Sequence, residues 1–154
     1  MSSNEAVGVR GSYRLHILEN GEIVGDSGWL DNQVTNEGFR NFLVRTLGAI
    51  AGSMQISHLA LGTGGVPAAA DTTLAGEVVK RQAVTAATSS TSKSVVFTGT
   101  FSSANSFVTD TRNISNIGLF NSSSTGTLFA GNTFASSSCA TNQDVQSTYV
   151  ITFA

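Results

Sequence analysis

The sequence predicts a mainly β protein, an antiparallel β-sandwich or jelly-roll-like domain with one short α-helix at about residues 36–47. Short segments rich in Val, Thr and Phe alternate apolar and polar residues, as half-buried strands do. Clusters of Ser, Thr, Asn and Gly separate these segments at short intervals. Only one segment repeats its apolar residues with the spacing of a helix.

A hairpin is predicted first. Apolar side chains occupy alternate positions from Val7 to Ile17, which gives this strand one buried face and one solvated face carrying His16. Asn20-Gly21 then favours a two-residue turn, because both residues tolerate positive φ. We expect residues 22–30 to return as the partner strand.

The predicted helix follows at residues 36–47. Thr35 or Asn36 can cap its N-terminus, because a side-chain oxygen there accepts a backbone N–H of the first turn. Gly48 suits the left-handed residue that commonly ends a helix. The face expected to be buried comprises Phe39, Phe42, Leu43 and Leu47.

The remainder reads as strands and turns. The intervening small polar runs are predicted loops, and one of them holds Cys139. With 154 residues, the chain is expected to form a single β-rich domain over 1–154, with residues 1–6 as a possible N-terminal arm. The further strands are expected at residues 54–61, 77–85, 93–101, 114–120, 127–134 and 145–153.

Composition argues against several classes of partner. Charged residues make up 12% of the chain, about half the usual share, and the net charge is −2 without any basic run. Nucleic-acid binding needs a positive stripe, so no nucleic-acid partner is expected. No apolar run reaches the roughly 18 residues of a membrane span, and the N-terminus lacks signal-peptide features. We expect assembly in a cytoplasm.

Residues 62–65, Gly-Thr-Gly-Gly, follow an apolar segment as phosphate-binding loops do. A P-loop would need a Lys directly after its last glycine, and the dinucleotide fingerprint would need a glycine where Pro67 stands. We therefore interpret the segment as a structural turn off a buried strand. A capped turn at Asp71 is expected to follow, with Leu74 filling the core.

No catalytic residue, metal ligand or cofactor is predicted, and no enzymatic activity is expected. Cys139 with His16 or His58 forms no recognisable nucleophile and base, and no cluster has zinc or calcium spacing. The acidic residues are dispersed, although a sugar-cleaving pair could still assemble in three dimensions. We expect Cys139→Ser to be nearly neutral, and Trp29 and the phenylalanines to be core residues.

Several segments, in this order, resemble small structural proteins of tailed bacteriophages, over roughly residues 28–154. The resemblance implies a virion component without catalytic residues to carry over. The segments are GWLDNQVTNEGFRNFLVRTLG at 28–48, ISHLALGTGGVPAAADTTLAGEVVKR at 56–81, ISNIGLFNSSSTGTLFAGNTF at 114–134 and a closing YVITFA at 149–154.

The expected function is therefore that of a capsid decoration (cement) protein, which binds the major capsid protein or other proteins of the assembled head. The alternative is a small tail, baseplate or fibre component that binds a host receptor or a glycan. Strand edges with few charges and a near-neutral chain also predict self-association, with a homotrimer expected. The predicted location is the virion, with no membrane contact.

Overall fold

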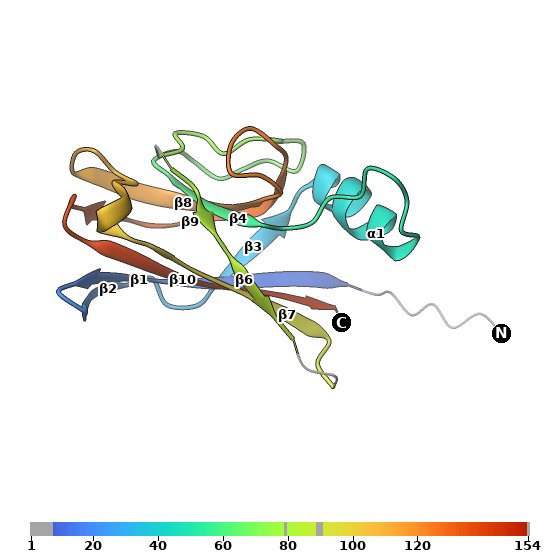
Figure 1. Cartoon of the computed structure of the whole chain (residues 1–154), viewed down its shortest axis with the longest axis horizontal. Helices are drawn as coiled ribbons and strands as arrows, with labels where there is room; N and C mark the ends of the chain where they lie inside the picture. The colour runs from blue at the N-terminus through green and yellow to red at the C-terminus, as the bar shows by residue number, and fades with distance from the viewer. Residues whose placement is uncertain (1–7, 79, 89–90, 154) are drawn as a thin grey trace.

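The computed structural model describes residues 8–78, 80–88 and 91–153 (Figure 1). It confirms a mainly β antiparallel fold with one short helix near residues 36–47. The arm at residues 1–6 lies outside the described residues. The helical segments are η1 (Gly38–Val44), α1 (Arg45–Leu47) and a single 3-10 turn, η2 (Ser103–Asn105). The strands are β1 (Val9–Glu19), β2 (Glu22–Asp26), β3 (Leu30–Val34), β4 (His58–Gly62), β5 (Gln82–Ala83), β6 (Thr85–Ala87), β7 (Ser94–Phe101), β8 (Arg112–Phe120), β9 (Leu128–Cys139) and β10 (Asp144–Phe153).

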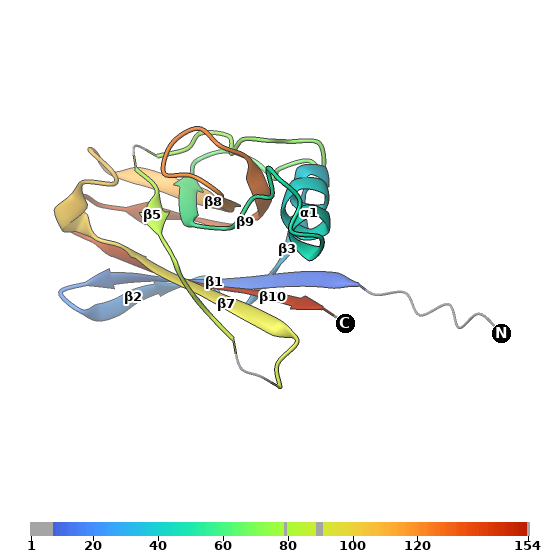
Figure 2. The same cartoon turned by 45° about the vertical axis from the view of Figure 1, so that its right-hand side comes forward.

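Two layers of strands share two corners, so the sheet nearly closes into a barrel (Figure 1, Figure 2). One layer has the order β6-β7-β10-β1, and the other has the order β4-β8-β9. At the first corner, β3 pairs with β1 through Leu30–Asn32 and with β9 through Gln33–Val34. At the second corner, β5 pairs with β4 while β6 pairs with β7. Strands that change sheets in this way make the corners of orthogonally packed β structures.

The alternation predicted for the first strand is confirmed in β1. Tyr13, Leu15 and Ile17 are buried, and β1 pairs with β10 along nearly its whole length. The Asn20-Gly21 turn is also confirmed, because both residues have positive φ (51° and 81°).

The partner strand predicted at residues 22–30 is wrong in its extent. β2 ends at Asp26, whose carboxylate accepts the Gly28 N–H (2.9 Å), and Gly28 has a φ of +67°. This local turn redirects the chain. The next strand, β3, therefore pairs with the other half of β1 and continues to the second layer.

The helix boundaries are confirmed, but its predicted buried face is only half right. Thr35 Oγ1 accepts the Gly38 N–H (3.0 Å), so Thr35 is the cap. The segment Gly38–Val44 is π-helical, and its i→i+5 bonding turns residues through smaller steps than an α-helix. Phe42 is 4% exposed, whereas Phe39 is 43% exposed and turned from the core.

The helix end also differs from the prediction. Leu47 is 90% exposed, because the last turn extends past the sheets it was expected to cover. Gly48 has a φ of −97°, and the left-handed residue is Ala49, with a φ of +47°.

Three of the later strands differ from their predicted extents. β4 begins at His58, and residues 54–57 run beside the sheet without belonging to it. The strand predicted at 77–85 is wrong in its first part, where Glu77 makes only an isolated bridge to Gly62 and the strand begins at Gln82. The corner at residue 84 then separates β5 from β6. β9 continues five residues beyond the predicted 134, so Cys139 ends a strand instead of lying in a loop.

Replacing Phe42 by Ala should lower the free energy of unfolding by about 3–5 kcal/mol, because a buried ring leaves a cavity. The ring packs edge-on against Phe129, with 5.2 Å between centroids. Phe39→Ala, three residues earlier on the same helix, is the matched control and should cost under about 1 kcal/mol. Urea unfolding of both variants measures the difference, and equal losses would contradict the assigned helix face.

Candidate binding groove

Residues 62–65 pack against a neighbouring turn and do not form an open cradle. The Thr63 N–H donates to the Gly76 carbonyl (3.0 Å). A Cβ placed on Gly64 would lie 2.4 Å from the Ala75 carbonyl oxygen. The three glycines of this segment do not have positive φ. They are needed because the absence of a Cβ lets two chain segments approach closely.

A buried asparagine on β8 holds the same loop. Asn116 Nδ2 donates to the carbonyls of Ala75 (3.0 Å) and Gly65 (3.2 Å). Its Oδ1 has no hydrogen-bond partner among the described residues and would lie 2.3 Å from a Cβ on Gly62. Gly62 is therefore required by the asparagine beside it. Leu74, as predicted, is buried against Phe120 and its neighbours in a small second cluster.

Arg81 joins three segments on the same side of the molecule. Its guanidinium pairs with both carboxylate oxygens of Glu77 (2.5 and 3.0 Å) and donates to the carbonyls of Ser122 and Thr125. It also lies over the Phe120 ring, 3.6 Å from the centroid. All of these contacts bind protein groups, so Arg81 stabilises the fold as a cross-link between loops.

The nucleophile and base candidates lie in unrelated places. Cys139 is buried, and burial together with the Asp144 carboxylate raises the pKa of its thiol to about 11. His58 Nδ1 lies 2.8 Å from Ser57 Oγ, and burial followed by the Arg81 charge lowers the pKa of His58. His16 lies on the outer face of β1, with its Nε2 3.5 Å from Asp26. Cys139 therefore contacts neither histidine in this arrangement of the described residues.

Most of the acidic residues have local partners. Arg14 and the Gly28 N–H hold the pKa of Asp26 well below its usual range. Asp71 accepts the Ala68 N–H (2.8 Å), and Asp144 accepts the Ser103 N–H (2.7 Å). Three or more His, Cys, Asp or Glu side chains nowhere gather as a metal site in the part of the chain that the structure describes.

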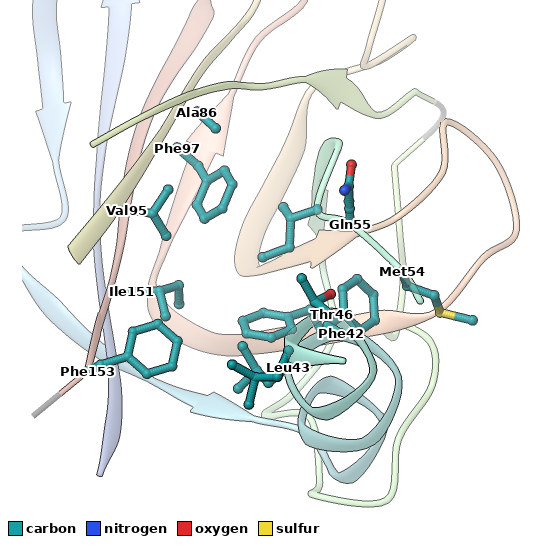
Figure 3. A pocket seen from close by; sticks show the side chains of 13 residues that line it. Phe42, Leu43, Thr46, Met54, Gln55, Ala86, Val95, Phe97, Ile151 and Phe153 are labelled. Atoms are coloured by element: carbon teal, nitrogen blue, oxygen red, sulfur yellow. The ribbon is translucent and has the colours of Figure 1, made fainter. Parts of the chain in front are cut away.

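An apolar groove of about 640 Å³ lies between the helix and the strands β6, β7 and β10 (Figure 3). Four aromatic rings contribute to its lining: Phe42, Phe97, Phe129 and Phe153. Residues 54–56 form one wall, and β6, β7 and β10 form the opposite one. Thr46 and Gln55 are its polar members, and no charged residue lies among the described residues that line it. A volume of this size is typical of binding sites.

Exposed apolar side chains surround the groove. Leu47 lines it, and Val44 and Ile50, from the same helix end and the following turn, are 60% and 53% exposed. Contiguous exposed apolar surface marks interaction sites more often than chance. The structure thus leaves exposed apolar side chains beside a groove whose described lining carries no charge.

A second, polar hollow of about 340 Å³ lies where β5, β6, β7 and β10 meet. Thr85, Thr98 and Thr148 follow one another across β6, β7 and β10 in register. Gln82 and Gln146 add amide groups. This surface offers neutral hydrogen-bonding groups at the spacing of neighbouring strands.

The expectation that Trp29 is a core residue is wrong, since it is 52% exposed just before β3. Phe39 and Phe153 are also exposed, while the other phenylalanines are buried, including Phe107 in the loop between η2 and β8. The groove itself was not predicted, because its walls come from segments far apart in the chain. The spacing of Val44, Leu47 and Ile50, which continues past the helix, is the signal that could have indicated it.

Comparison with known proteins finds no family model, no curated protein and no solved structure that matches the chain. Among the described residues, no helix is both long enough and apolar enough to cross a membrane.

The Cys139 thiol should resist alkylation in the folded protein. A pKa of about 11 leaves little thiolate at pH 8, and burial blocks the reagent. Iodoacetamide should label the native chain far more slowly than the chain in denaturant, as read by mass spectrometry. Rapid native labelling at pH 8 would contradict this environment.

The buried position also changes the expectation for Cys139→Ser. Cys139 lies in a strand and not in the expected loop. A serine hydroxyl buried at this position is therefore expected to lower the free energy of unfolding by about 1–3 kcal/mol.

Proposed function

We propose that this chain is a non-enzymatic structural protein of a tailed-bacteriophage particle, a capsid decoration protein that binds the assembled head. The observation that carries the proposal is the apolar groove with its uncharged lining, together with the exposed apolar side chains beside it. A protein that functions alone in water gains nothing from this surface, whereas neighbours in an assembly would cover it. The order of the segments at residues 28–48, 56–81 and 114–134 supports the same class.

The charge distribution suits close packing of many copies. Net charge is −2 and charged residues make up 12% of the chain, so neighbouring copies repel one another weakly. Its partners are copies of itself, in a trimer, and the major capsid protein or other virion proteins. Many modest contacts, repeated over a shell, hold such a protein by avidity. Its location is the virion, after assembly in the host cytoplasm.

The test uses particles that lack this protein. Purified chain added back should sediment with the heads and raise the temperature at which they release their genome. Isolated tails serve as the control surface and should retain none. Binding to tails alone would favour the alternative below, and binding to neither would contradict a virion role.

The alternative is a small tail, baseplate or fibre component that binds a host receptor or a glycan, and the polar hollow favours it. In-register threonine hydroxyls beside Gln82 and Gln146 suit the hydroxyl groups of a neutral sugar. Replacing both Thr98 and Thr148 by Val keeps their shape and removes two hydroxyls.

If the alternative holds, this double variant should lose binding to host-cell glycans by at least about tenfold. Binding to a glycan array reports the change. Leu47→Asp, at the groove, is the control that should bind glycans normally. An unmodified chain that binds no glycan on the array would exclude the alternative.

A further inference from the structure

We infer that the polar hollow between β5, β6, β7 and β10 binds one neutral pyranose ring that carries equatorial hydroxyls on alternate carbons, as glucose does. The inference rests on the proposed glycan-binding alternative, and it names the class of sugar and the part of the fold that holds it. It does not depend on where in a particle the chain is located.

The hollow is lined by hydroxyls that the fold does not use. Four threonines line it, and their hydroxyls are hydrogen-bonded to no other residue in the described part of the chain: Thr85, Thr98, Thr100 and Thr148. Thr152, on the same face of β10, differs, because its Oγ1 lies 2.7 Å from Ser94 Oγ. The four hydroxyls in the hollow are therefore available both to donate to a ligand and to accept from it.

The positions of three of these threonines set the spacing. Thr85, Thr98 and Thr148 follow one another in register across β6, β7 and β10. Neighbouring strands of a sheet are about 4.8 Å apart. Equatorial hydroxyls on alternate carbons of a pyranose ring are separated by nearly the same distance, whereas hydroxyls on adjacent carbons lie closer together. Two alternate hydroxyls can therefore meet two neighbouring threonines at once.

The charges around the hollow argue against an acidic ligand. No charged residue is among the described residues that line it. The next residue along the threonine row is Arg14 of β1, which is in register with Thr148. Its Nε and Nη2 both donate to the carboxylate of Asp26 (3.0 and 2.5 Å). A phosphate or carboxylate in the hollow would lack a free cation to pair with, so we infer a neutral ligand.

The remaining lining selects hydroxyls over flat or apolar surfaces. The described lining contains no aromatic ring, so it offers no platform on which the face of a ring could stack. An apolar molecule would leave the amides of Gln82 and Gln146 without partners. The volume of about 340 Å³ is near the lower end for ligand sites and suits one sugar ring.

The edge of β7 favours a small molecule over an added polypeptide strand. β7 continues to Phe101, but its pairing with β6 in the described chain ends at Thr98. An added strand would need the edge that follows. However, the Ala83 carbonyl oxygen lies 3.2 Å from the position of a Cβ on Gly99, so β5 already lies against this part of β7. The short open edge that remains suits a single ring.

NMR titration of the isotopically labelled full chain tests the class of sugar. The probes are the methyl β-glycosides of glucose, mannose and galactose, in which the methyl group blocks the hydroxyl on carbon 1. The hydroxyls on carbons 2 and 4 are both equatorial in glucose, whereas the first is axial in mannose and the second is axial in galactose. The glucoside should shift the amide signals of Gly99 and Thr148. It should bind about tenfold more tightly than the other two, the effect of one hydrogen bond.

A second titration tests the threonine row itself. Thr98 is the middle member of the row and is exposed, and valine keeps its branched shape, so Thr98→Val should fold normally. This variant should bind the glucoside about tenfold more weakly, because one hydroxyl contact is lost. Thr152→Val is the matched control on the same face of β10, outside the hollow, and should bind the glucoside as the unmodified chain does.

Other outcomes overturn the inference. Equal binding of the three glycosides, or unchanged binding by Thr98→Val, would show that the threonine row does not select the sugar. Signal shifts confined to residues outside the hollow would place the sugar elsewhere, although the glycan-binding alternative would survive. If no glycoside binds at tens of millimolar but a glycan array retains the chain, the ligand is not a single neutral ring. If the array also retains nothing, the alternative fails too, and binding to heads still tests the decoration role.

Discussion

The fold depends on two tyrosines that are buried between the layers and satisfied by hydrogen bonds. Tyr13 of β1 and Tyr149 of β10 are paired in register, and their rings stack with centroids 5.4 Å apart. The Tyr13 hydroxyl donates to the Thr133 carbonyl of β9 (2.6 Å), and the Tyr149 hydroxyl accepts from Asn32 Nδ2 (2.6 Å). A buried phenol without such partners would cost several kcal/mol. Burial raises the pKa of Tyr13 to about 12 and also raises that of Tyr149, so both phenols remain neutral.

This arrangement fixes both the register and the first corner. A slip of one residue between β1 and β10 would turn one tyrosine to the outer face. Asn32 reaches Tyr149 across Gly11, where a Cβ would collide with its side chain, so the glycine in β1 belongs to the same unit. At the second corner, a single backbone hydrogen bond is given by the Val84 N–H to the Ser57 carbonyl (3.0 Å). Beyond it, residues 54–56 and β6 diverge, and the groove occupies the space between them.

The sequence predicted the features that depend on local chemistry. The alternation in β1, the Asn20-Gly21 turn and a helix cap at Thr35 or Asn36 each follow from neighbouring residues. The failures at β3 and at the groove share a different cause, which is tertiary context. β3 was not predicted, because its first half pairs with β1 in one layer and its second half pairs with β9 in the other. Its sequence therefore has polar residues between Leu30 and Val34 and lacks the alternation of a half-buried strand. The groove could not be predicted, because its walls meet only after both corners have formed.

The pairing of β1 with β10 also has a consequence for synthesis. A ribosome that has completed β1 must add more than 120 further residues before Asp144–Phe153 appears, since β1 ends at Glu19. At about 5–20 residues per second, this takes on the order of ten seconds. Throughout that time the apolar face of β1 lacks its partner strand. The nascent chain therefore presents an open strand edge, for which chaperones and neighbouring nascent chains compete before the barrel can close.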